Sequence, residues 1–516
     1  MSIEVELKLA VPPRALRKAA RLPWLNRLAN GPVTRKKLVS VYFDTAKFKL
    51  RDNGLTLRIR KVGRKRLQTI KATDGTAGPA GRKEWEEEVA SARPNLKLAR
   101  HTALAPFVTR KLKRSLRPVF ETEVQRIVMP LRVGDSDVEL ALDRGRIKSG
   151  RRHETISEIE LELKRGNRTD IARLAERLAR ELPVSYGARA KSERGYALRA
   201  NERHKPADAE EIVLDRDASA GDALAVIGLS CLHHLAANED AVRHGVPEGV
   251  HQMRVGPRRL RAAISLFGEM VKGSETEQIK TELKWLGEQL GAARDFDVLV
   301  EESVAPLRKA SPGKPELKLL ETDLKKKRDK GFDTAKAAVA SERYRAAVLT
   351  TALWLINGKW LNDKASAIAD ARARPARAFA RDVLDRRTGK IIKNIGKLDD
   401  LSAGERHKVR IAVKKLRYAT DFLGSLFPKR KARRARKRFQ KTLEALQDAL
   451  GTLNDIAVHE TLARQFAHPR KRSSKRPEKA FAMGVLTGRE QSHARACIAA
   501  AGKAGATLSK TDYFWR

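Results

Sequence analysis

The first 200 residues alternate between polar and apolar positions with a period of two, which is typical of β-strands that have one polar and one apolar face. In the segment EVELK near the N-terminus, Glu4, Glu6 and Lys8 alternate with Val5 and Leu7. The pattern recurs in eight segments, which are IEVELKL, LVSVYFD, GLTLRIRK, RLQTIKA, KEWEEEVA, VFETEVQRIV, DVELALD and TISEIELELK. We therefore expect eight strands bounded by turn residues.

The second half of the chain, from about residue 218, is rich in Ala, Leu, Lys and Arg and places apolar residues at helical spacing. Two of its motifs occur twice. HQMRVGPRRLRAAISLF starts at His251 and HKVRIAVKKLRYATDFL at His407, while LGAARDFDVL starts at Leu290 and LGTLNDIAVH at Leu450. The copies are offset by 156 and 160 residues, which indicates duplication of a helical unit.

These patterns predict an α+β chain with two domains. If the strands close on one another, they form a barrel with flanking helices near residues 12–28 and 168–182, and the helical half is expected to form two bundles of about four helices each. The polar segment NERHKPADAEE separates the halves and is interpreted as linker. The expected bounds are 1–200 for the barrel, 201–217 for the linker and 218–510 for the helical domain, whose repeat units cover about 218–370 and 371–510.

The composition indicates a polyanionic partner. Lys and Arg number 108 against 63 Asp and Glu, so that the formal net charge is +45. This excess favours nucleic acid, polyphosphate or an anionic membrane surface. Aromatic residues make up only 5% of the chain, and the basic stripes that begin at His251 and His407 lack interleaved rings, which argues against base stacking on single strands. Phosphate contacts alone would still give non-specific association with nucleic acid.

The sequence also indicates where in the cell the protein is expected to act. The longest apolar stretches, such as VLTTALWLIN, are shorter than the roughly 18 to 20 residues of a membrane span, and the N-terminus lacks a signal-like apolar region. The two cysteines, Cys231 and Cys497, lie far apart, which argues against a disulfide framework. We therefore expect a cytoplasmic protein without a membrane partner, and association with polyphosphate granules is a further option.

Charged residues gather on one face of several predicted strands. If these strands close into a barrel whose apolar outside is covered by helices, the charged faces line a polar tunnel. The expected lining is Lys8, Arg58, Arg60, Lys71, Arg126 and Lys191 together with Glu4, Glu6, Asp143, Glu158 and Glu160. A carboxylate about 4 Å from a phosphate repels it by about 4 kcal/mol at an effective dielectric constant of about 20. Mg²⁺ or Mn²⁺ held by the carboxylates removes this conflict and activates or positions a water.

Glu84, Glu86 and Glu88 share a face of another predicted strand. A solvated or salt-bridged surface explains this acidic face as well as a functional role does. The sequence therefore leaves both interpretations open.

Residues 1–200 resemble the CYTH family, the triphosphate tunnel metalloenzymes, through EVELK, LRIR, TIK, EWEEE, ELALDRG and EIELE. The resemblance implies an eight-stranded antiparallel tunnel that hydrolyses a triphosphate with a metal ion. It implies phosphate binding by Lys8, Arg58, Arg60, Lys71, Arg126 and Lys191 and metal ligation by Glu4, Glu6, Glu158 and Glu160. It places Asp143 near the attacking water or a second metal. The implied catalytic residues are Glu4, Glu6, Lys8 and Asp143.

Each copy of the duplicated motif places basic residues at offsets 0, 3, 7 and 10, which share one face of a helix. These basic stripes are His251, Arg254, Arg258 and Arg261 in the first copy and His407, Arg410, Lys414 and Arg417 in the second. Like charges along one helix face cost stability unless an anion or an acid compensates them. The motif resembles the CHAD family over about 218–510, which implies two pseudo-symmetric four-helix bundles whose stripes bind inorganic polyphosphate.

Three functional hypotheses fit these observations. The first is a metal-dependent triphosphatase that hydrolyses inorganic tripolyphosphate in the tunnel and binds polyphosphate through its helical half, as the resemblance to bacterial CYTH-CHAD inorganic triphosphatases implies. Thiamine triphosphate, nucleoside triphosphates and cyclisation of ATP are alternative chemistries for the tunnel. The second hypothesis is a non-catalytic polyphosphate-binding or granule-associated protein. The third, nucleic-acid binding, is supported by the charge alone.

Overall fold

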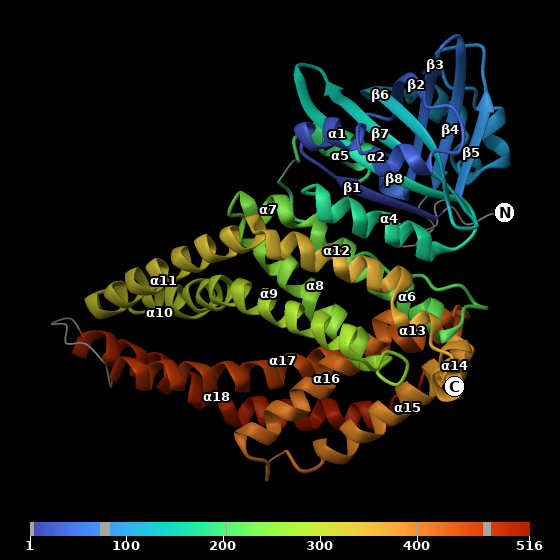
Figure 1. Ribbon diagram of the computed structural model, residues 1–516. Coiled ribbons are helices and arrows are strands. Elements are labelled where there is room, and N and C mark those ends of the chain that lie inside the picture. The colour runs from blue at the N-terminus through green and yellow to red at the C-terminus, as the bar shows by residue number, and fades with distance from the viewer. Residues whose placement is uncertain (1–4, 73–82, 203, 399, 468–475) are drawn as a thin grey trace. The chain divides into compact units, whose positions relative to one another are not determined.

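The protein divides into two compact units, which are described separately. The structure, a computed structural model, describes residues 5–72, 83–202, 204–398, 400–467 and 476–516 (Figure 1). The first unit comprises Met1–Val213, Gly228–Gln252 and Ala340–Asp363, and the second comprises Leu214–Ile227, Met253–Val339 and Lys364–Arg516. Two segments of the helical half thus belong to the first unit. The domain bounds expected from the sequence stay a prediction.

The first unit is built on one antiparallel sheet of nine strands in the order β5-β4-β3-β2-β6-β7-β8-β1-β9. The strands are β1 (Val5–Ala10), β2 (Thr34–Asp44), β3 (Leu55–Val62), β4 (Lys65–Ala72), β5 (Lys83–Glu88), β6 (Arg117–Val133), β7 (Ser136–Ser149), β8 (Arg152–Arg165) and β9 (Ser185–Tyr186). Each of the eight alternating segments of the sequence contributes to one of the strands β1 to β8.

The expected closed barrel of eight strands is wrong, because the sheet is open, with β5 and β9 at its edges. Closure requires a ladder between the two edges, and none is present among the residues that the structure describes. The edge strand β9 has only two residues, both paired with β1, and offers few groups for a further ladder. Alternation fixes the face that each side chain takes, whereas closure also depends on the tilt and stagger of the strands.

Short helices connect and cover the strands. They are α1 (Pro13–Ala19), α2 (Pro23–Leu28), α3 (Arg110–Ser115), α4 (Arg168–Glu181) and α5 (Lys191–Ala200), with 3-10 turns η1 (Arg51–Asn53), η2 (Leu98–His101) and η3 (Ala105–Phe107). The two faces of the sheet differ as the alternation predicts. On β1, Leu7 and Leu9 are buried whereas Glu6 and Lys8 are partly exposed. Helix α4 packs against β8, so the apolar positions of this region lie against a helix.

Helix α5 packs against β6, β7 and β8. Its Tyr196 belongs to a buried apolar cluster with Phe120 of β6, and the two rings meet edge to face at 5.1 Å. Gly195 lies so close to Phe120 that an added Cβ would be 2.1 Å from a ring carbon. The absence of a side chain at Gly195 therefore allows the close packing that positions Lys191 and Arg194 on the same helix.

A buried carboxylate connects β2 to α5. Asp44 is fully buried and accepts hydrogen bonds from the backbone N–H groups of Thr45, Leu50 and Arg51 at 2.6, 2.9 and 3.0 Å. The hydroxyl of Tyr196 donates to the same carboxylate at 3.0 Å. Burial, with the Asp44 carboxylate adding to it, raises the pKa of Tyr196, so the hydroxyl stays a donor.

The helical half contains the remaining elements. They are α6 (Ala220–Ala237), α7 (Glu239–Arg243), α8 (Pro247–Leu266), α9 (Ser274–Val298), the π-helix η4 (Leu299–Val304), α10 (Ala305–Ala310), α11 (Pro315–Ala340), α12 (Glu342–Asn357), α13 (Lys359–Asn362), α14 (Ser366–Ala373), α15 (Ala376–Ile395), α16 (Ala403–Leu423), the 3-10 turn η5 (Gly424–Leu426), α17 (Arg430–Ala467) and α18 (Arg476–Lys510). In the first unit, α12 packs against α4 and β9. In the second unit, α15 contacts α16 and α18, and α17 contacts α16 and α18. The expected pair of pseudo-symmetric four-helix bundles stays a prediction.

One helical stretch, Ala220–Arg243, is long and apolar enough to cross a membrane by length and composition. The protein itself buries 67% of its apolar window. A core helix passes the same test, because the interior of a folded protein selects the same residues as lipid does.

We predict that Asp44→Ala destabilises the first unit by about 3 kcal/mol or more, because it leaves buried N–H and hydroxyl donors without an acceptor. The measurement is urea unfolding of the full-length protein, followed by tryptophan fluorescence and circular dichroism. The matched control is Asp52→Ala, which removes an exposed carboxylate paired with Arg51 and should change stability by less than about 0.5 kcal/mol. Equal effects of the two substitutions would contradict the structural role of Asp44.

Candidate functional site: a charged face of the sheet

The register of the sheet aligns charged residues of four strands. Arg126 on β6 lies opposite Asp143 on β7, and Asp143 lies opposite Glu158 on β8. Lys8 on β1 lies opposite Glu160 on β8. Residues directly opposite each other in an antiparallel pair point to the same face. The sheet thus gathers cations and carboxylates from separate segments on one face.

Three carboxylates form the centre of this face. Asp143, Glu158 and Glu160 are buried, with 0%, 6% and 8% of their surface exposed. Each offers an oxygen that lies within 4.8 Å of the others. Carboxylates this close and this far from water repel one another strongly, so that cations must compensate them.

Three cations compensate the carboxylates directly. The ammonium of Lys191, at the start of α5, lies 2.7 Å from Asp143 and 2.8 Å from Glu160, and it also contacts Glu158. The guanidinium of Arg126 binds Asp143 with two hydrogen bonds of 2.7 and 2.6 Å and also contacts Glu160. The third cation, Lys8, lies 3.6 Å from Glu160 and 3.5 Å from Glu6.

The protonation of this cluster follows from burial and charge. For Glu160, burial favours the neutral acid, but Lys191, Lys8 and Arg126 outweigh it and hold the pKa well below the usual range. Burial raises the pKa of Glu6, and the neighbouring Glu160 adds to the effect although Lys8 opposes it. For Lys191, the three carboxylates outweigh burial and raise the pKa. Glu160 and Lys191 are therefore held in their charged forms, whereas Glu6 accepts a proton more readily.

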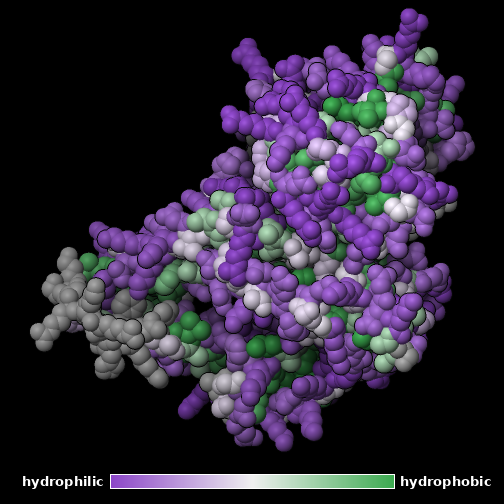
Figure 2. All heavy atoms as spheres, in the orientation of Figure 1, coloured by the Kyte–Doolittle hydropathy of each residue, from purple (hydrophilic) through white to green (hydrophobic). Residues whose placement is uncertain are grey.

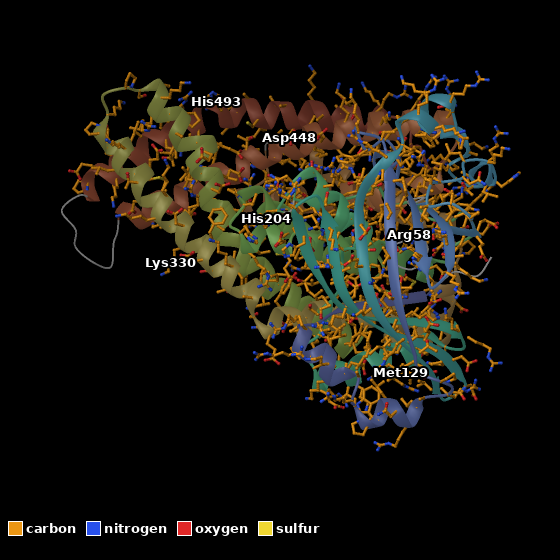
Figure 3. All side chains as sticks on the ribbon, turned by 90° about the horizontal axis from the view of Figure 1, so that it is seen from above. Arg58, Met129, His204, Lys330, Asp448 and His493 are labelled. Carbon is orange, nitrogen blue, oxygen red and sulfur yellow. The ribbon has the colours of Figure 1, made fainter. Side chains whose placement is uncertain are left out.

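A second group of charges lies on β3, β4 and β5. Lys71 and Arg58 form ion pairs with Glu84 at 2.6 and 3.5 Å. Arg58, which is labelled in Figure 3, also donates a hydrogen bond of 3.4 Å to the hydroxyl of Tyr42. Burial and the neighbouring Arg58 lower the pKa of Arg60 to about 10. Glu84 therefore compensates two cations of this group.

The structure brings together most of the residues that the sequence indicates. Lys8, Arg126, Lys191, Glu6, Asp143, Glu158 and Glu160 share one network of ion pairs, and Arg58 and Lys71 share another through Glu84. Arg58 of one group and Arg126 of the other both lower the pKa of Arg60. Arg60 therefore lies within electrostatic reach of both groups. Glu4 lies outside the described residues.

Sequence reasoning missed two contributors to this face and left a third open. Arg194 of α5 binds Glu154 at 2.7 Å and Glu158 at 3.4 Å, and its position one helical turn after Lys191 is the signal that would have identified it. Tyr42 lies opposite Arg58 in the β2–β3 ladder, which alternation alone does not reveal. Of the acidic face on β5, Glu84 proves to be salt-bridged to Lys71 and Arg58.

The carboxylate centre fits a hard divalent cation. Asp143, Glu158 and Glu160 offer only oxygen ligands, as Mg²⁺ and Mn²⁺ prefer, and their oxygens are close enough to share one ion. The ammonium of Lys191 lies where the three carboxylates meet, which shows that the centre accommodates positive charge. Asp143 thus joins Glu158 and Glu160 as a candidate ligand, whereas Glu6 is paired with Lys8.

A separate cationic cluster lies in the second unit, where residues of α8 and α16 meet. Arg258 donates a hydrogen bond of 2.9 Å to the Tyr418 hydroxyl. Burial, Arg410 and Arg258 lower the pKa of Lys414 to about 8, with Asp455 opposing them and Arg254 adding a smaller contribution. Burial is likewise the largest cause that lowers the pKa of Arg410. Residues of the two basic stripes thus lie close enough to affect each other's pKa, so positive charge accumulates where α8 and α16 meet. The visible surface of the protein is largely hydrophilic (Figure 2).

Three other stripe residues each bind a polar side chain of another helix. Arg254 pairs with Asp295 at 2.6 Å, His407 hydrogen-bonds Asn454 at 2.6 Å, and Arg417 donates to Gln447 at 3.1 Å. Arg261 is exposed and lies near enough to Lys415 to affect its pKa. His251 lies on α8, in the part of that helix assigned to the first unit.

Comparison with known families finds two different domain families along the chain. Residues 2–196 match the CYTH domain family and residues 227–464 match the CHAD domain family. The chain joins a CYTH domain to a CHAD domain. All described residues of the carboxylate and cation network fall within the CYTH match, and both basic stripes fall within the CHAD match.

The CYTH domain has a curated relative. It is 30% identical over 200 residues to an inorganic triphosphatase of Haemophilus influenzae, an alignment that covers 38% of this chain and 54% of that protein. The chain thus spans about half the length of this relative. A putative adenylyl cyclase from Hippeastrum, described as having a dominant triphosphatase activity, is 19% identical with a TM-score of 0.29 and covers 38% of this chain and 96% of that chain. A TM-score this low supports no further conclusion.

The CHAD domain has a structural relative. The crystal structure of the CHAD domain from the plant Ricinus communis is 30% identical, with a TM-score of 0.50. The match covers 60% of this chain and 99% of that chain. It supports a CHAD fold for the helical region.

We predict that Lys191→Met increases the affinity of the substrate-free CYTH domain for Mn²⁺ by about tenfold or more, since it removes the ammonium that competes for the three carboxylates. Mn²⁺ titration of the full-length protein, followed by electron paramagnetic resonance, measures this affinity. Lys164→Met is the matched control, because Lys164 pairs with Glu162 at the exposed end of β8. An affinity that is unchanged or weaker in Lys191→Met would show that the metal binds elsewhere.

Proposed function

We propose that the CYTH domain is a metal-dependent triphosphatase that hydrolyses a small triphosphate, with inorganic tripolyphosphate as the preferred substrate. The observation that carries the proposal is the buried centre of Asp143, Glu158 and Glu160, surrounded by cations from β1, β6 and α5. The relationship to an inorganic triphosphatase supports the same reaction class. Metal dependence follows from the family and from the oxygen ligands of the centre.

In this proposal the cations of the face bind phosphate oxygens. Lys8, Arg126 and Lys191 already form ion pairs with carboxylates, and a phosphate chain offers them further anionic partners. When bound, Mg²⁺ or Mn²⁺ supplies positive charge to the phosphates and an activated water. Glu6, whose pKa burial raises, is suited to accept a proton from the attacking water, with Lys8 beside it at 3.5 Å.

The extent of the charged face supports a chain of phosphates as the substrate. Arg58, Arg60 and Lys71 continue the positive charge beyond the carboxylate centre, toward β3 and β4. In this proposal they hold the far phosphates, and Glu84 is displaced from Lys71 and Arg58 when substrate binds. Recognition would then rest on phosphate groups, which inorganic tripolyphosphate presents without a base or a vitamin moiety.

We predict that Glu160→Gln lowers phosphate release from tripolyphosphate with Mg²⁺ or Mn²⁺ by about a hundredfold or more, because it removes a buried charge at the reaction centre. The assay measures released phosphate for tripolyphosphate, ATP and thiamine triphosphate with each metal. Glu123→Gln, which affects a carboxylate paired with Arg146 and Lys148 away from the centre, should retain the wild-type rate. Undiminished hydrolysis in Glu160→Gln would refute the proposed centre. If the wild-type protein hydrolyses none of the three substrates, a non-catalytic polyphosphate-binding protein is favoured instead.

We further propose that the CHAD domain binds inorganic polyphosphate through the basic stripes of α8 and α16. The supporting observation is the depressed pKa of Lys414, to about 8, which burial and the nearby arginines Arg410 and Arg258 cause. Such a cluster is under electrostatic strain that a polyanion relieves. Aromatic residues make up only 5% of the chain, and nucleic acid is expected to bind only non-specifically. Cytoplasmic location, in contact with polyphosphate granules, is part of the same proposal.

We predict that polyphosphate binding weakens by up to about tenfold per pH unit above pH 8, because neutral Lys414 must take up a proton when the polyanion binds. Below pH 8 the amine is already protonated, so this dependence vanishes. Lys414→Arg stays charged and should flatten the profile between pH 7.5 and 9.5, whereas the exposed control Lys408→Arg should not. Fluorescence anisotropy with labelled polyphosphate measures the affinity, and identical profiles for both variants would contradict the assignment.

A further inference from the structure

Two histidines and an aspartate come together in the first unit, away from the carboxylate centre. His204 lies in the segment after α5, Asp240 lies in the first turn of α7, and His244 directly follows the end of that helix. The Nδ1 atom of His204 is 2.7 Å from the Asp240 carboxylate, and that of His244 is 3.4 Å from it. The two imidazoles stack with their centroids 3.5 Å apart. One ligand atom from each residue lies within 4.8 Å of the others.

The local structure holds these residues in place. Asp240 and His244 are four residues apart on one helical turn and therefore share a face. The fully buried Asn238 fixes the segment that carries His204, because its side chain accepts a hydrogen bond from the backbone N–H of Ala207 and donates one to the carbonyl of Ala207, both at 2.9 Å. The Gln252 side chain adds a hydrogen bond of 3.0 Å to Asp208. His204 is thus anchored to the turn that carries its partners.

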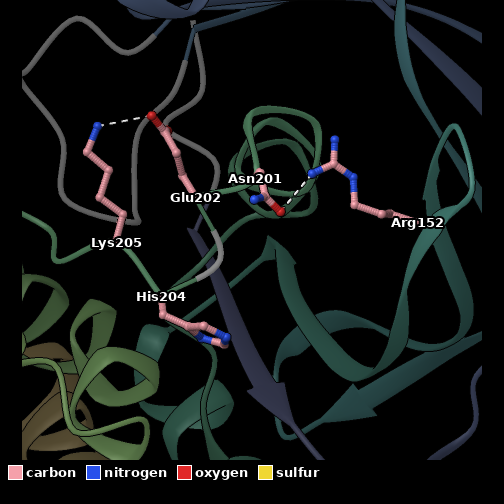
Figure 4. A pocket seen from close by; sticks show the side chains of 5 residues that line it. All are labelled: Arg152, Asn201, Glu202, His204 and Lys205. Atoms are coloured by element: carbon pink, nitrogen blue, oxygen red, sulfur yellow. Dashed lines mark hydrogen bonds and ion pairs between the residues drawn. The ribbon is translucent and has the colours of Figure 1, made fainter.

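The charged residues next to this cluster form ion pairs with other partners. Arg243 is paired with Glu239, and Lys205 is paired with Glu202. In Figure 4, His204 lines a pocket of about 560 Å³ together with Lys205, Glu202, Asn201 and Arg152. Within the part of the chain that the structure describes, Asp240 forms ion pairs with the two histidines and with no Lys or Arg. The negative charge of Asp240 is therefore compensated by the two histidines or by a cation that they bind.

We propose that His204, Asp240 and His244 bind a divalent transition-metal ion of the zinc class. Two imidazole nitrogens and one carboxylate oxygen are the donor set that zinc prefers among protein ligands, and three protein ligands leave a coordination position open to water or to an anion. The stacked rings bring a nitrogen of each imidazole and an oxygen of Asp240 close enough together to share one ion. All three side chains are partly exposed, so an ion can enter from solvent.

The donor chemistry separates this site from the carboxylate centre. Asp143, Glu158 and Glu160 offer oxygen alone, which suits Mg²⁺ or Mn²⁺, while the histidine site offers nitrogen and favours Zn²⁺. The proposal does not depend on triphosphate hydrolysis. The chain would then carry two metal sites of different selectivity in one unit.

The test is Zn²⁺ binding to metal-stripped full-length protein in competition with a chromogenic chelator. We expect a Zn²⁺ site whose affinity falls at least about tenfold in His204→Ala and in His244→Ala, and which excess Mg²⁺ does not displace. His101→Ala, which removes an exposed histidine of η2, is the matched control and should bind Zn²⁺ as the wild type does. Equal Zn²⁺ affinity in all three variants would overturn the proposal.

A second measurement uses the wild-type protein and therefore does not depend on the folding of variants. Diethyl pyrocarbonate modifies accessible imidazoles, and mass spectrometry locates the modified residues. Zn²⁺ should protect His204 and His244 from modification by about tenfold while His101 reacts at its metal-free rate, and Mg²⁺ should protect none of them. Equal modification of His204 and His244 with and without Zn²⁺ would overturn the proposal as well.

Discussion

The architecture of the CYTH domain depends on the ion pairs that surround three carboxylates where little water reaches them. Asp143, Glu158 and Glu160 repel one another, and each ionised group loses hydration on burial. Arg126 and Lys191 offset both costs with short ion pairs. The strands β6 to β8 and helix α5 are therefore held in a mutual arrangement by charge as well as by apolar packing. A substrate or metal that enters this centre exchanges partners with existing ion pairs and does not create a charged cluster from neutral groups.

The sequence predicted the strands and the polar face because alternation is a local property. Leu7 and Leu9 are buried and Glu6 and Lys8 face the charged side, as a period of two requires. Closure of the sheet was predicted wrongly, since it depends on which edges meet, and the two-residue strand β9 carries no alternation that a sequence could show. Local patterns thus determined the faces but not the number of strands or the edges.

The candidate site was most predictable where its partners lie on strands joined by hairpins, and less so where they come from other elements. Arg126, Asp143 and Glu158 become neighbours through the register of β6, β7 and β8, which follows from their hairpins. Arg194 joins the site through the tertiary placement of α5, and its spacing from Lys191 is a sequence signal for it, although the predicted site did not include it. Glu84 joins it through pairing of the edge strand β5, and the sequence left its role open. In the CHAD domain, duplication revealed both stripes. The depressed pKa of Lys414 was not predictable, because it arises from burial, from Arg410 on the same helix and from Arg258 on α8.

The contact between Gly195 and Phe120 links the apolar core of the CYTH domain to its chemistry. Because the helix backbone rests directly on an aromatic ring, the depth at which α5 lies is set by the absence of a single methyl group. Lys191 and Arg194 are on the same short helix, so a displacement of α5 would withdraw an ammonium and a guanidinium from the acidic centre together. Glycine at this position is thus a determinant of electrostatics, although it bears no charge itself.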